Sequence, residues 1–322
     1  MVKAKKYSET TNNQIYQQGL LTFKLSDGKY KLKPSLTLDN TDIEIQIKPI
    51  DLVVDSKQIY KPIYVEHKEL GEYFSLVNFQ NSILFSANKY DMLIPCYDSS
   101  ISQIHIKVTQ NDKNIIEQNL VDKIELDEKF TKKNNDIVLL NKSHNKKLNY
   151  FFINNIGKAL IEGEIKIQIL LKDLNISYTS NVLWKDKPNS LHNVEEAIEF
   201  LSLIGYKRSA DSLLNFPENK QYAALYGFWK NLDTDTSSAY SDIFNEFYTR
   251  IDFINREFNS LGKNDGMDTD RGKVYLIFGK PDSIERKFNN VYDVLEIWDY
   301  KSINKKIFFS DKTGTGKFER IK

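Results

Sequence analysis

The chain has little cysteine, proline or glycine, and no long apolar run. Of its 322 residues, 1 is cysteine, 7 are proline and 13 are glycine. The single cysteine, Cys96, excludes an intramolecular disulfide and a zinc site built from several cysteines. No stretch approaches the roughly 20 apolar residues that a membrane-spanning helix needs. We therefore expect neither a disulfide framework nor a membrane span.

The chain also lacks an excess of charge of either sign. It carries 45 Lys and Arg against 44 Asp and Glu, and its formal net charge is +1. Such a balance gives no general electrostatic attraction to nucleic acid, so we expect no nucleic-acid partner. The content of 40% hydrophobic and 12% aromatic residues is typical of globular proteins, and the length suffices for two or three domains.

The first half of the chain has the pattern of β-strands. Apolar and polar residues alternate in several short runs between residues 18 and 184; for example, Ile43, Ile45 and Ile47 are separated by polar residues. Turn residues divide two of these runs near 111–114 and 173–175. Short strands at this spacing favour antiparallel packing. We predict a β-sandwich region over residues 1–186, built as one module or as two, 1–70 and 71–186.

The second half, residues 187–322, is predicted to be helical and then α+β. Ser190 is a plausible N-cap for a first helix, and apolar residues recur every three or four positions up to residue 261. The segments "KVYLIFG", "VLEIWDY", "KIFFS" and "KFERI" then read as short strands. The fold class is therefore multidomain: an antiparallel β-sandwich region, a helical segment and a small C-terminal α+β unit.

Aromatic residues are dense in the helical segment. Phe228 and Trp229 precede a ladder of further aromatic side chains, namely Tyr240, Phe244, Phe247 and Tyr248. Their spacing favours core contacts between the helices and the terminal sheet. The alternative is an aromatic groove that binds sugar or peptide, which requires exposed rings.

The stretch "DGMDTDRGKVYLIFGKPDSIE", residues 265–285, concentrates charge and turn residues around one apolar run. Asp265, Asp268 and Asp270 are weak candidates for binding a hard cation, although no register of this loop matches the EF-hand pattern. The structural interpretation is that Thr269 and Asp270 accept backbone N–H bonds before a strand, with Arg271 as counter-ion.

Glycines of this stretch are predicted to take backbone angles that other residues avoid, at Gly266 and Gly272. The following "FGKPDSIE" places Gly279, Pro281 and Asp282 in a turn. We predict that this whole stretch forms a structural corner.

A last motif, "SDKTGTGKFE", contains the phosphorylated-aspartate signature of ion-pumping ATPases at Asp311. The chain ends shortly afterwards, which leaves no room for the domain that such pumps place downstream. The same residues lack the first glycine of a phosphate-binding loop, and Lys317 is followed by Phe318. We therefore interpret the motif as a β-hairpin with a glycine-rich turn and predict no cofactor.

Several of these segments occur in one order that resembles a known family. "EFYTRIDFINREF", "GMDTDRGKVYLIFGKPDSIE", "VLEIWDY" and "IFFSDKTGTGKFERI" are similar to the bacterial GWxTD domain-containing proteins, whose motif runs Gly-Trp-x-Thr-Asp-Arg-Gly. Here Met267 replaces the tryptophan. The resemblance covers residues 187–322 strongly. It marks the following motif residues: Gly266, Met267, Asp268, Thr269, Asp270, Arg271, Gly272, Gly279, Pro281, Asp282, Trp298 and Asp311.

The resemblance implies β-sandwich domains ahead of the motif and a place in the cell envelope, and it implies no established reaction. No export signal is visible at the start of the chain, so a cytoplasmic location is the alternative. We expect a non-enzymatic envelope protein whose C-terminal unit docks onto a protein or glycan.

An alternative reading makes the C-terminal unit a hydrolase. In it, Asp270 and Arg271 lie in a cleft, with Asp268 or Glu285 as acid–base partner. A deep pocket lined by Asp270, Arg271 and Trp298 would favour the enzyme. A buried, fully paired network would favour the structural corner.

Overall fold

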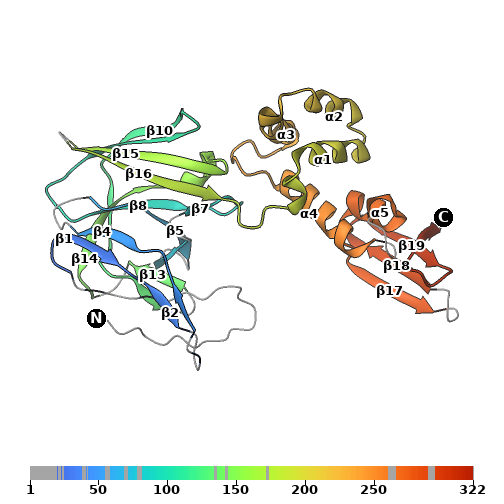
Figure 1. Ribbon diagram of the computed structural model, residues 1–322, viewed down its shortest axis with the longest axis horizontal. Coiled ribbons are helices and arrows are strands. Elements are labelled where there is room, and N and C mark those ends of the chain that lie inside the picture. Colours follow the sequence, from blue (N-terminus) through green and yellow to red (C-terminus); the bar gives the residue numbers. More distant parts are fainter. Residues whose placement is uncertain are drawn as a thin grey trace. The chain divides into compact units, whose positions relative to one another are not determined.

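The chain divides into two compact units, Met1–Trp184 and Lys185–Lys322, which we describe separately (Figure 1). The computed structural model describes residues 20, 23, 25–37, 41, 43–54, 59–68, 72–77, 82–133, 136–141, 144–171, 174–259, 266–288 and 294–321. No helix within these ranges is both long and apolar enough to cross a membrane.

The first unit contains a five-stranded sheet with the order β10-β9-β15-β16-β7. All neighbours in it are antiparallel except β16 and β7. The turn between β9 and β10 has positive φ angles at Asn111 and Asp112, as the predicted tight hairpin requires. The strands are β7 (Ser82–Leu84), β9 (Ile104–Gln110), β10 (Lys113–Leu120), β15 (Gly163–Leu171) and β16 (Leu174–Leu183).

A seven-stranded antiparallel sheet follows the order β11-β14-β8-β5-β6-β13-β12. It curls so that β11 contacts β13, and a cluster that includes Leu93, Leu126 and Leu139 fills the inside of the curl. Its strands are β5 (Ile63–Lys68), β6 (Tyr73–Leu76), β8 (Asp91–Cys96), β11 (Lys123–Asp127), β12 (Thr131–Lys133), β13 (Asp136–Leu140) and β14 (Lys147–Ile153).

The two large sheets of the first unit are joined by side chains. The Tyr64 hydroxyl on β5 hydrogen-bonds with Ser180 on β16, and the Tyr178 hydroxyl donates to the carbonyl of Ile59 at 3.1 Å. Every residue of β8 is buried, as expected for a strand covered on both faces. The predicted antiparallel β-rich first region is therefore confirmed.

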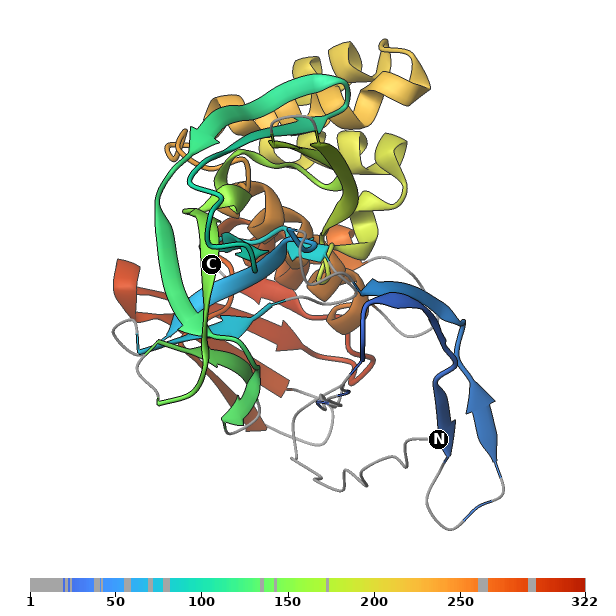
Figure 2. The same ribbon diagram turned by 90° about the vertical axis from the view of Figure 1, so that its left-hand side faces the viewer.

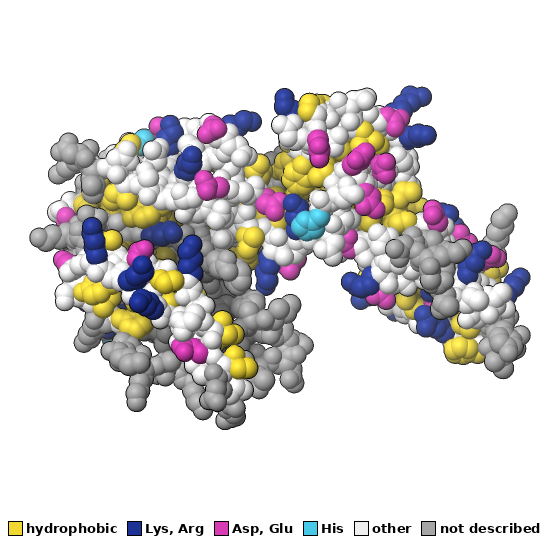
Figure 3. All heavy atoms as spheres, viewed as in Figure 1, with side chains coloured by type: hydrophobic (Ala, Val, Ile, Leu, Met, Phe, Trp, Pro, Cys, Tyr) yellow, Lys and Arg dark blue, Asp and Glu magenta, His cyan; other side chains and the backbone are white. Residues whose placement is uncertain are grey.

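A β-ribbon precedes these sheets and belongs to neither of them (Figure 2, blue). In the ribbon, β1 (Gly28–Leu32) pairs with β4 (Ile50–Val54), and β2 (Ser35–Thr37) pairs with β3 (Glu44–Gln46). Apolar and basic side chains lie side by side at the surface over this segment (Figure 3).

The second unit begins with helices. Asn193, and not the predicted Ser190, caps the first α-helix through a bond from the Glu196 N–H. Ser190 is occupied elsewhere, because its N–H donates to Asp252 and its hydroxyl donates to the Tyr248 carbonyl. The helices are η3 (Asn189–Leu191), α1 (Val194–Glu199), η4 (Phe200–Ile204), α2 (Lys207–Leu214), α3 (Glu218–Leu232) and α4 (Asp242–Glu257).

The predicted aromatic core is present, but its rings pack between the helices α3 and α4 and not against the terminal sheet as predicted. Trp229 contacts Phe244, Phe247 and Tyr248, and all four side chains are buried. The Tyr248 hydroxyl donates to the Ala197 carbonyl at 2.7 Å, which ties α4 to α1. Aromatic packing of this kind adds directional contacts to the area that the rings bury.

The segment "KVYLIF" is a helix, so the strand predicted there is wrong. It lies in α5 (Asp270–Phe278), which follows the short η5 (Gly266–Asp268) and is capped by Thr269. Val274, Tyr275 and Leu276 are all buried in α5. Because consecutive residues are buried, the sequence shows no alternation of apolar and polar residues with the period of a helix. Its β-branched and aromatic residues are then typical of a strand.

A four-stranded antiparallel sheet with the order β17-β18-β19-β20 ends the chain. Trp298 at its centre is fully buried against Phe258, Tyr275 and Phe309. The predicted hairpin around the glycine-rich turn is confirmed by the pairing of β19 with β20. The strands are β17 (Ser283–Phe288), β18 (Val294–Tyr300), β19 (Lys305–Asp311) and β20 (Glu319–Ile321), and η6 (Lys301–Ile303) follows β18.

Candidate functional site

The motif at the start of α5 is held by short local hydrogen bonds. The Thr269 hydroxyl donates to the Gly266 carbonyl at 2.8 Å and accepts the Gly272 N–H at 3.0 Å, which is an N-cap. The Asp270 carboxylate accepts the backbone N–H of Arg320 at 2.7 Å and so connects α5 with β20. Thr269 and Asp270 thus both accept backbone N–H bonds, as predicted, although they do so at the start of a helix.

The two motif glycines are required for close approach, which corrects the prediction that they supply unusual backbone angles. Neither has a positive φ. A Cβ added at Gly272 would lie 2.0 Å from the Gly266 carbonyl oxygen, and one at Gly266 would lie 2.5 Å from the Ile254 carbonyl oxygen. Since these obstacles are backbone atoms, any side chain at either position would force α5 away from η5 and α4.

Arg271 and Glu296 form the centre of a buried ionic network. Arg271 is 7% exposed and Glu296 only 1%. One Glu296 oxygen accepts the Arg286 Nε at 2.7 Å, while the other accepts the Trp298 indole N–H at 2.7 Å and lies 3.7 Å from Arg271 Nη1. Both oxygens of this buried carboxylate are therefore used by the protein itself.

The Arg271 side chain is enclosed on its other sides. Its guanidinium lies over the rings of Phe258 and Phe318, at 5.1 and 4.1 Å from their centroids, and Nη2 donates to the Gly316 carbonyl at 3.2 Å. Nε has no hydrogen-bond partner among the residues that the structure describes. Burial lowers the pKa of Arg271, and the neighbouring Glu296 opposes that shift. The arginine is thus a buried cation that depends on Glu296 for its neutralisation.

Asp311 is the anion at the centre of its own loop. Its carboxylate accepts N–H bonds from Thr313 at 3.1 Å and from Gly316 at 2.7 Å, and it also accepts the Thr313 hydroxyl. Burial raises the pKa of Asp311, but the bonds from Gly316, Thr313 and Gly314 outweigh it and leave the pKa below its ordinary value. The backbone amides that could hold a phosphate therefore hold this side chain.

The remaining predicted residues lie at the corner and beyond it. The Gly279 carbonyl accepts the Tyr300 hydroxyl at 3.0 Å, and Asp282 accepts the Lys301 N–H at 2.7 Å. Pro281 is buried. Glu285 is exposed on β17 and lies 3.4 Å from Lys287. The structure thus brings Arg271, Trp298 and Asp311 together around Glu296 and Gly316. It places Asp282 in the turn before β17, and Glu285 on β17 opposite Ile297.

The candidate cation ligands are not gathered into a site by the described residues. Asp268 is exposed, Asp270 holds Arg320, and Asp265 lies outside the described residues. Within the described ranges, no group of three or more His, Cys, Asp or Glu side chains is close enough to hold a metal ion. Met267, at the position of the family's tryptophan, is half-buried in η5, and nothing in its surroundings explains the replacement.

Part of the chain matches a known family of domains. The sequence profile of the GWxTD domain matches residues 172–319. The chain contains a GWxTD domain. The match includes the motif, the buried ionic network and the Asp311 loop, so these features belong to the GWxTD domain itself. No curated protein and no solved structure matches the chain.

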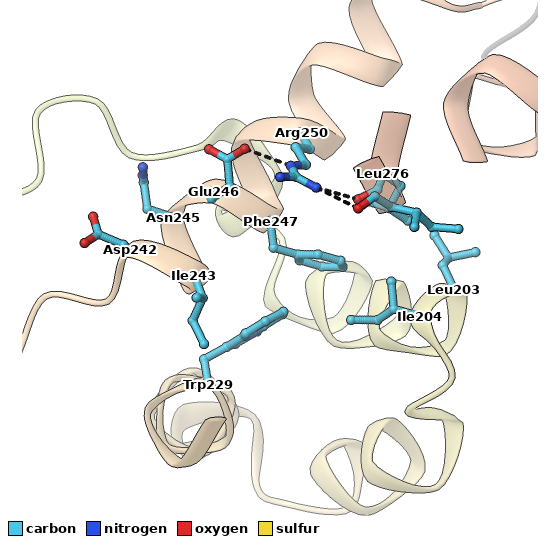
Figure 4. A pocket seen from close by; sticks show the side chains of 11 residues that line it. Leu203, Ile204, Trp229, Asp242, Ile243, Asn245, Glu246, Phe247, Arg250 and Leu276 are labelled. Carbon is cyan, nitrogen blue, oxygen red and sulfur yellow. Dashed lines mark hydrogen bonds and ion pairs between the residues drawn. The ribbon is translucent and has the colours of Figure 1, made fainter. Parts of the chain in front are cut away.

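The GWxTD domain also contains a groove that the motif does not line (Figure 4). Its volume is about 850 Å³, and it opens to solvent between α3, α4, η4 and the end of α5. Trp229 and Phe247 line its interior, and Ile277 is the most exposed of its apolar residues, at 64%. The full lining comprises Leu203, Ile204, Trp229, Asp242, Ile243, Asn245, Glu246, Phe247, Arg250, Leu276 and Ile277.

Arg250 connects this groove with α5. Its Nη1 donates to the carbonyls of Leu276 and Ile277 at 3.0 and 3.2 Å, and its Nε bonds to Glu246 at 2.8 Å (Figure 4). A cation that satisfies the last carbonyls of a helix also complements its dipole. Glu246 and Arg250 belong to the segment "EFYTRIDFINREF", which resembles the family. Glu296 was not predicted as a site residue, although its position two residues before the strand tryptophan in "VLEIWDY" was a usable signal.

Proposed function

We propose that the GWxTD domain is a non-catalytic docking unit and that the groove beside α4 is its binding surface. The observation that supports this most is that the domain's own groups bind the carboxylates in and around the motif. Glu296, Asp311 and Asp270 each accept hydrogen bonds from the domain's own groups. A general acid, base or nucleophile must come within hydrogen-bond distance of a substrate. These carboxylates instead bind groups of the domain itself.

The occupant that fits the groove is a segment of a partner protein with apolar side chains beside basic ones. The exposed apolar residues Leu203, Ile243 and Ile277 provide the hydrophobic contact. Asp242 and Glu246 line the groove together with Arg250, to which Glu246 is bonded, and across residues 194–258 acidic residues outnumber basic ones. Such a surface attracts a basic partner and fixes its orientation by charge.

The test is a selection of random peptides displayed on phage against the full chain, followed by affinity measurement with the enriched synthetic peptides. We expect them to carry spaced apolar residues together with Lys or Arg. Ile277→Lys should weaken their binding about 10-fold to 100-fold, the value of one lost buried side chain. Ile284→Lys is the matched control, since Ile284 is 52% exposed and lies on β17 outside the groove.

Two results would refute the docking proposal. One is enrichment of peptides without that pattern. The other is equal binding to the wild type and to Ile277→Lys. The hydrolase alternative stays a prediction, and it requires that Asp270→Asn abolishes a hydrolytic activity that the wild type shows.

A location in the cell envelope is the part of the proposal that rests on family resemblance. Fractionation of the native host, followed by immunodetection of this chain, tests it. Detection in the cytoplasmic fraction alone would refute an envelope role while leaving the docking surface to be tested separately.

A further inference from the structure

The β-ribbon of the first unit has one apolar and one polar face. Leu36 pairs with Ile45 across the ribbon, and Ile43 and Ile47 fall on the same face as Ile45 because strand side chains alternate. These four side chains are 47 to 55% exposed. The opposite face carries the polar pairs of Ser35 with Gln46 and of Thr37 with Glu44. Two strands alone are marginally stable in water, so such a ribbon needs further strands or a covering surface.

The register of β3 shows which backbone groups face its outer edge. The Ile47 N–H donates to the Pro34 carbonyl at 3.1 Å, so residue 47 points toward β2, and Ile45, two residues earlier, points the same way. The backbone groups of Glu44, Gln46 and Lys48 then point outward. Among the described residues, β3 pairs with β2 only. An outer edge of this kind is a template for pairing with another strand.

The sequence around this edge is complementary to itself in the antiparallel direction. If two copies of β3 align with Gln46 opposite Gln46, then Glu44 of each copy lies opposite Lys48 of the other. Ile45 lies opposite Ile47, so each apolar side chain meets an apolar one on the same face. The outward N–H and C=O groups of all three polar residues would then exchange hydrogen bonds between the copies, as in an antiparallel ladder. Opposite charges directly across such a ladder stabilise it.

We propose that the partner of the ribbon is a second copy of this chain, joined through antiparallel pairing of β3 about Gln46. The pairing makes one four-stranded sheet from two ribbons, with the order β2-β3-β3-β2 and two Glu44–Lys48 ion pairs between the copies. This inference is independent of the docking groove, because it concerns the first unit only.

The charge pairing provides a test by exchange between copies. Glu44→Lys places two Lys–Lys pairs across the interface, and Lys48→Glu places two Glu–Glu pairs there. We expect each variant to dissociate about tenfold more readily than the wild type in sedimentation equilibrium of the full chain. An equimolar mixture of the two variants restores two Lys–Glu pairs, and so should the double variant. Lys29→Glu is the control, since Lys29 is exposed on β1 opposite the uncharged Val53 and lies outside the paired segment.

A cross-link at the centre of symmetry gives an independent readout. Residues in a hydrogen-bonded antiparallel pair have Cα atoms about 5.5 Å apart, within the range of a disulfide. Gln46→Cys should therefore form a covalent dimer under mild oxidation, and the buried native Cys96 should not. Ser35→Cys, on β2 at the far side of the ribbon, is the matched control and should form no covalent dimer.

The outcomes decide the proposal in both directions. Recovery of association in the mixture of single variants, together with the Gln46→Cys cross-link, would establish the pairing. Residues 44 and 48 of one strand are too far apart to form an ion pair with each other, so the recovery must come from ion pairs between two copies. A chain that stays monomeric at high concentration would overturn it. So would a dimer whose dissociation is unchanged by both charge variants.

Discussion

Removing the charge of Glu296 tests whether the GWxTD motif is a structural corner. In Glu296→Gln, the buried Arg271 loses its counter-ion, and the amide keeps only one of the two acceptor oxygens that Arg286 and Trp298 use in the wild type. Leaving one member of a buried ion pair uncompensated costs about 3 to 5 kcal/mol. For a unit of this size, that lowers the melting temperature on the order of 10 to 20 °C.

The assay is scanning calorimetry of the full chain, with tryptophan fluorescence to assign the transition. Trp229 and Trp298 lie in the second unit but Trp184 lies in the first, so the fluorescence is read in a Trp184→Phe background, where the transition that it reports is the one that should move. Glu285→Gln is the matched control: it makes the same chemical change on the same sheet, at an exposed pair with Lys287 that contributes at most about 1 kcal/mol.

A Glu296→Gln protein that melts within a few degrees of the wild type would refute this reasoning. The network would then contribute little to stability, and the motif's charges would be available for a ligand. Adding Arg271→Met to Glu296→Gln distinguishes the cost of the uncompensated arginine from the cost of the lost hydrogen bonds. If the cost arises from an uncompensated arginine, the double variant should regain part of the lost stability, since the two effects are coupled.

Three further predictions concern the same unit. Gly272→Ala should destabilise the second unit by about 3 kcal/mol or more, because the added Cβ would lie 2.0 Å from the Gly266 carbonyl oxygen. Gly227→Ala, in open space on α3, should stabilise the unit by about 0.5 to 1 kcal/mol. Urea titration of both variants checks this prediction. Thr269→Ala should cost about 0.5 to 2 kcal/mol through the lost N-cap, and a serine at this position should restore most of it in the same titration. Asp311 has a lowered pKa in the folded state, so its carboxylate stabilises the fold at pH values above its ordinary pKa of 3.8, and this stabilisation is lost as the pH falls below that value. Asp311→Asn should therefore have a lower melting temperature at pH 7, and its melting temperature should vary less with pH in that acid range.

Local patterns in the sequence predicted much of the fold. The turn at 111–112, the strand pair 163–183 and the terminal hairpin depend on residues close in the chain, and all three are present. The α4 helix follows from its spacing of apolar residues. The order of the strands in the two large sheets does not, because it is decided by contacts between segments far apart, such as β16 with β7.

The site was only partly predictable for a similar reason. Thr269 and Asp270 were expected to accept backbone N–H groups, and they do. The helix that they begin was mistaken for a strand, because Val274 to Leu276 is buried throughout and leaves no period of 3.6 residues. Glu296 was missed because its importance comes from Arg286 and Arg271, which reach it from another strand and from α5.

The position of α5 links the GWxTD motif to the groove, although the motif's own contacts do not reach the groove. The helix begins at the motif, is nine residues long and ends at the groove, where Arg250 donates to the carbonyls of Leu276 and Ile277. It therefore acts as a rigid spacer: what fixes its start also fixes where Leu276 and Ile277 stand in the groove wall. The motif does not line the groove, yet in this way it can set the groove's width. Selection for binding would then act on motif residues that the bound partner does not contact.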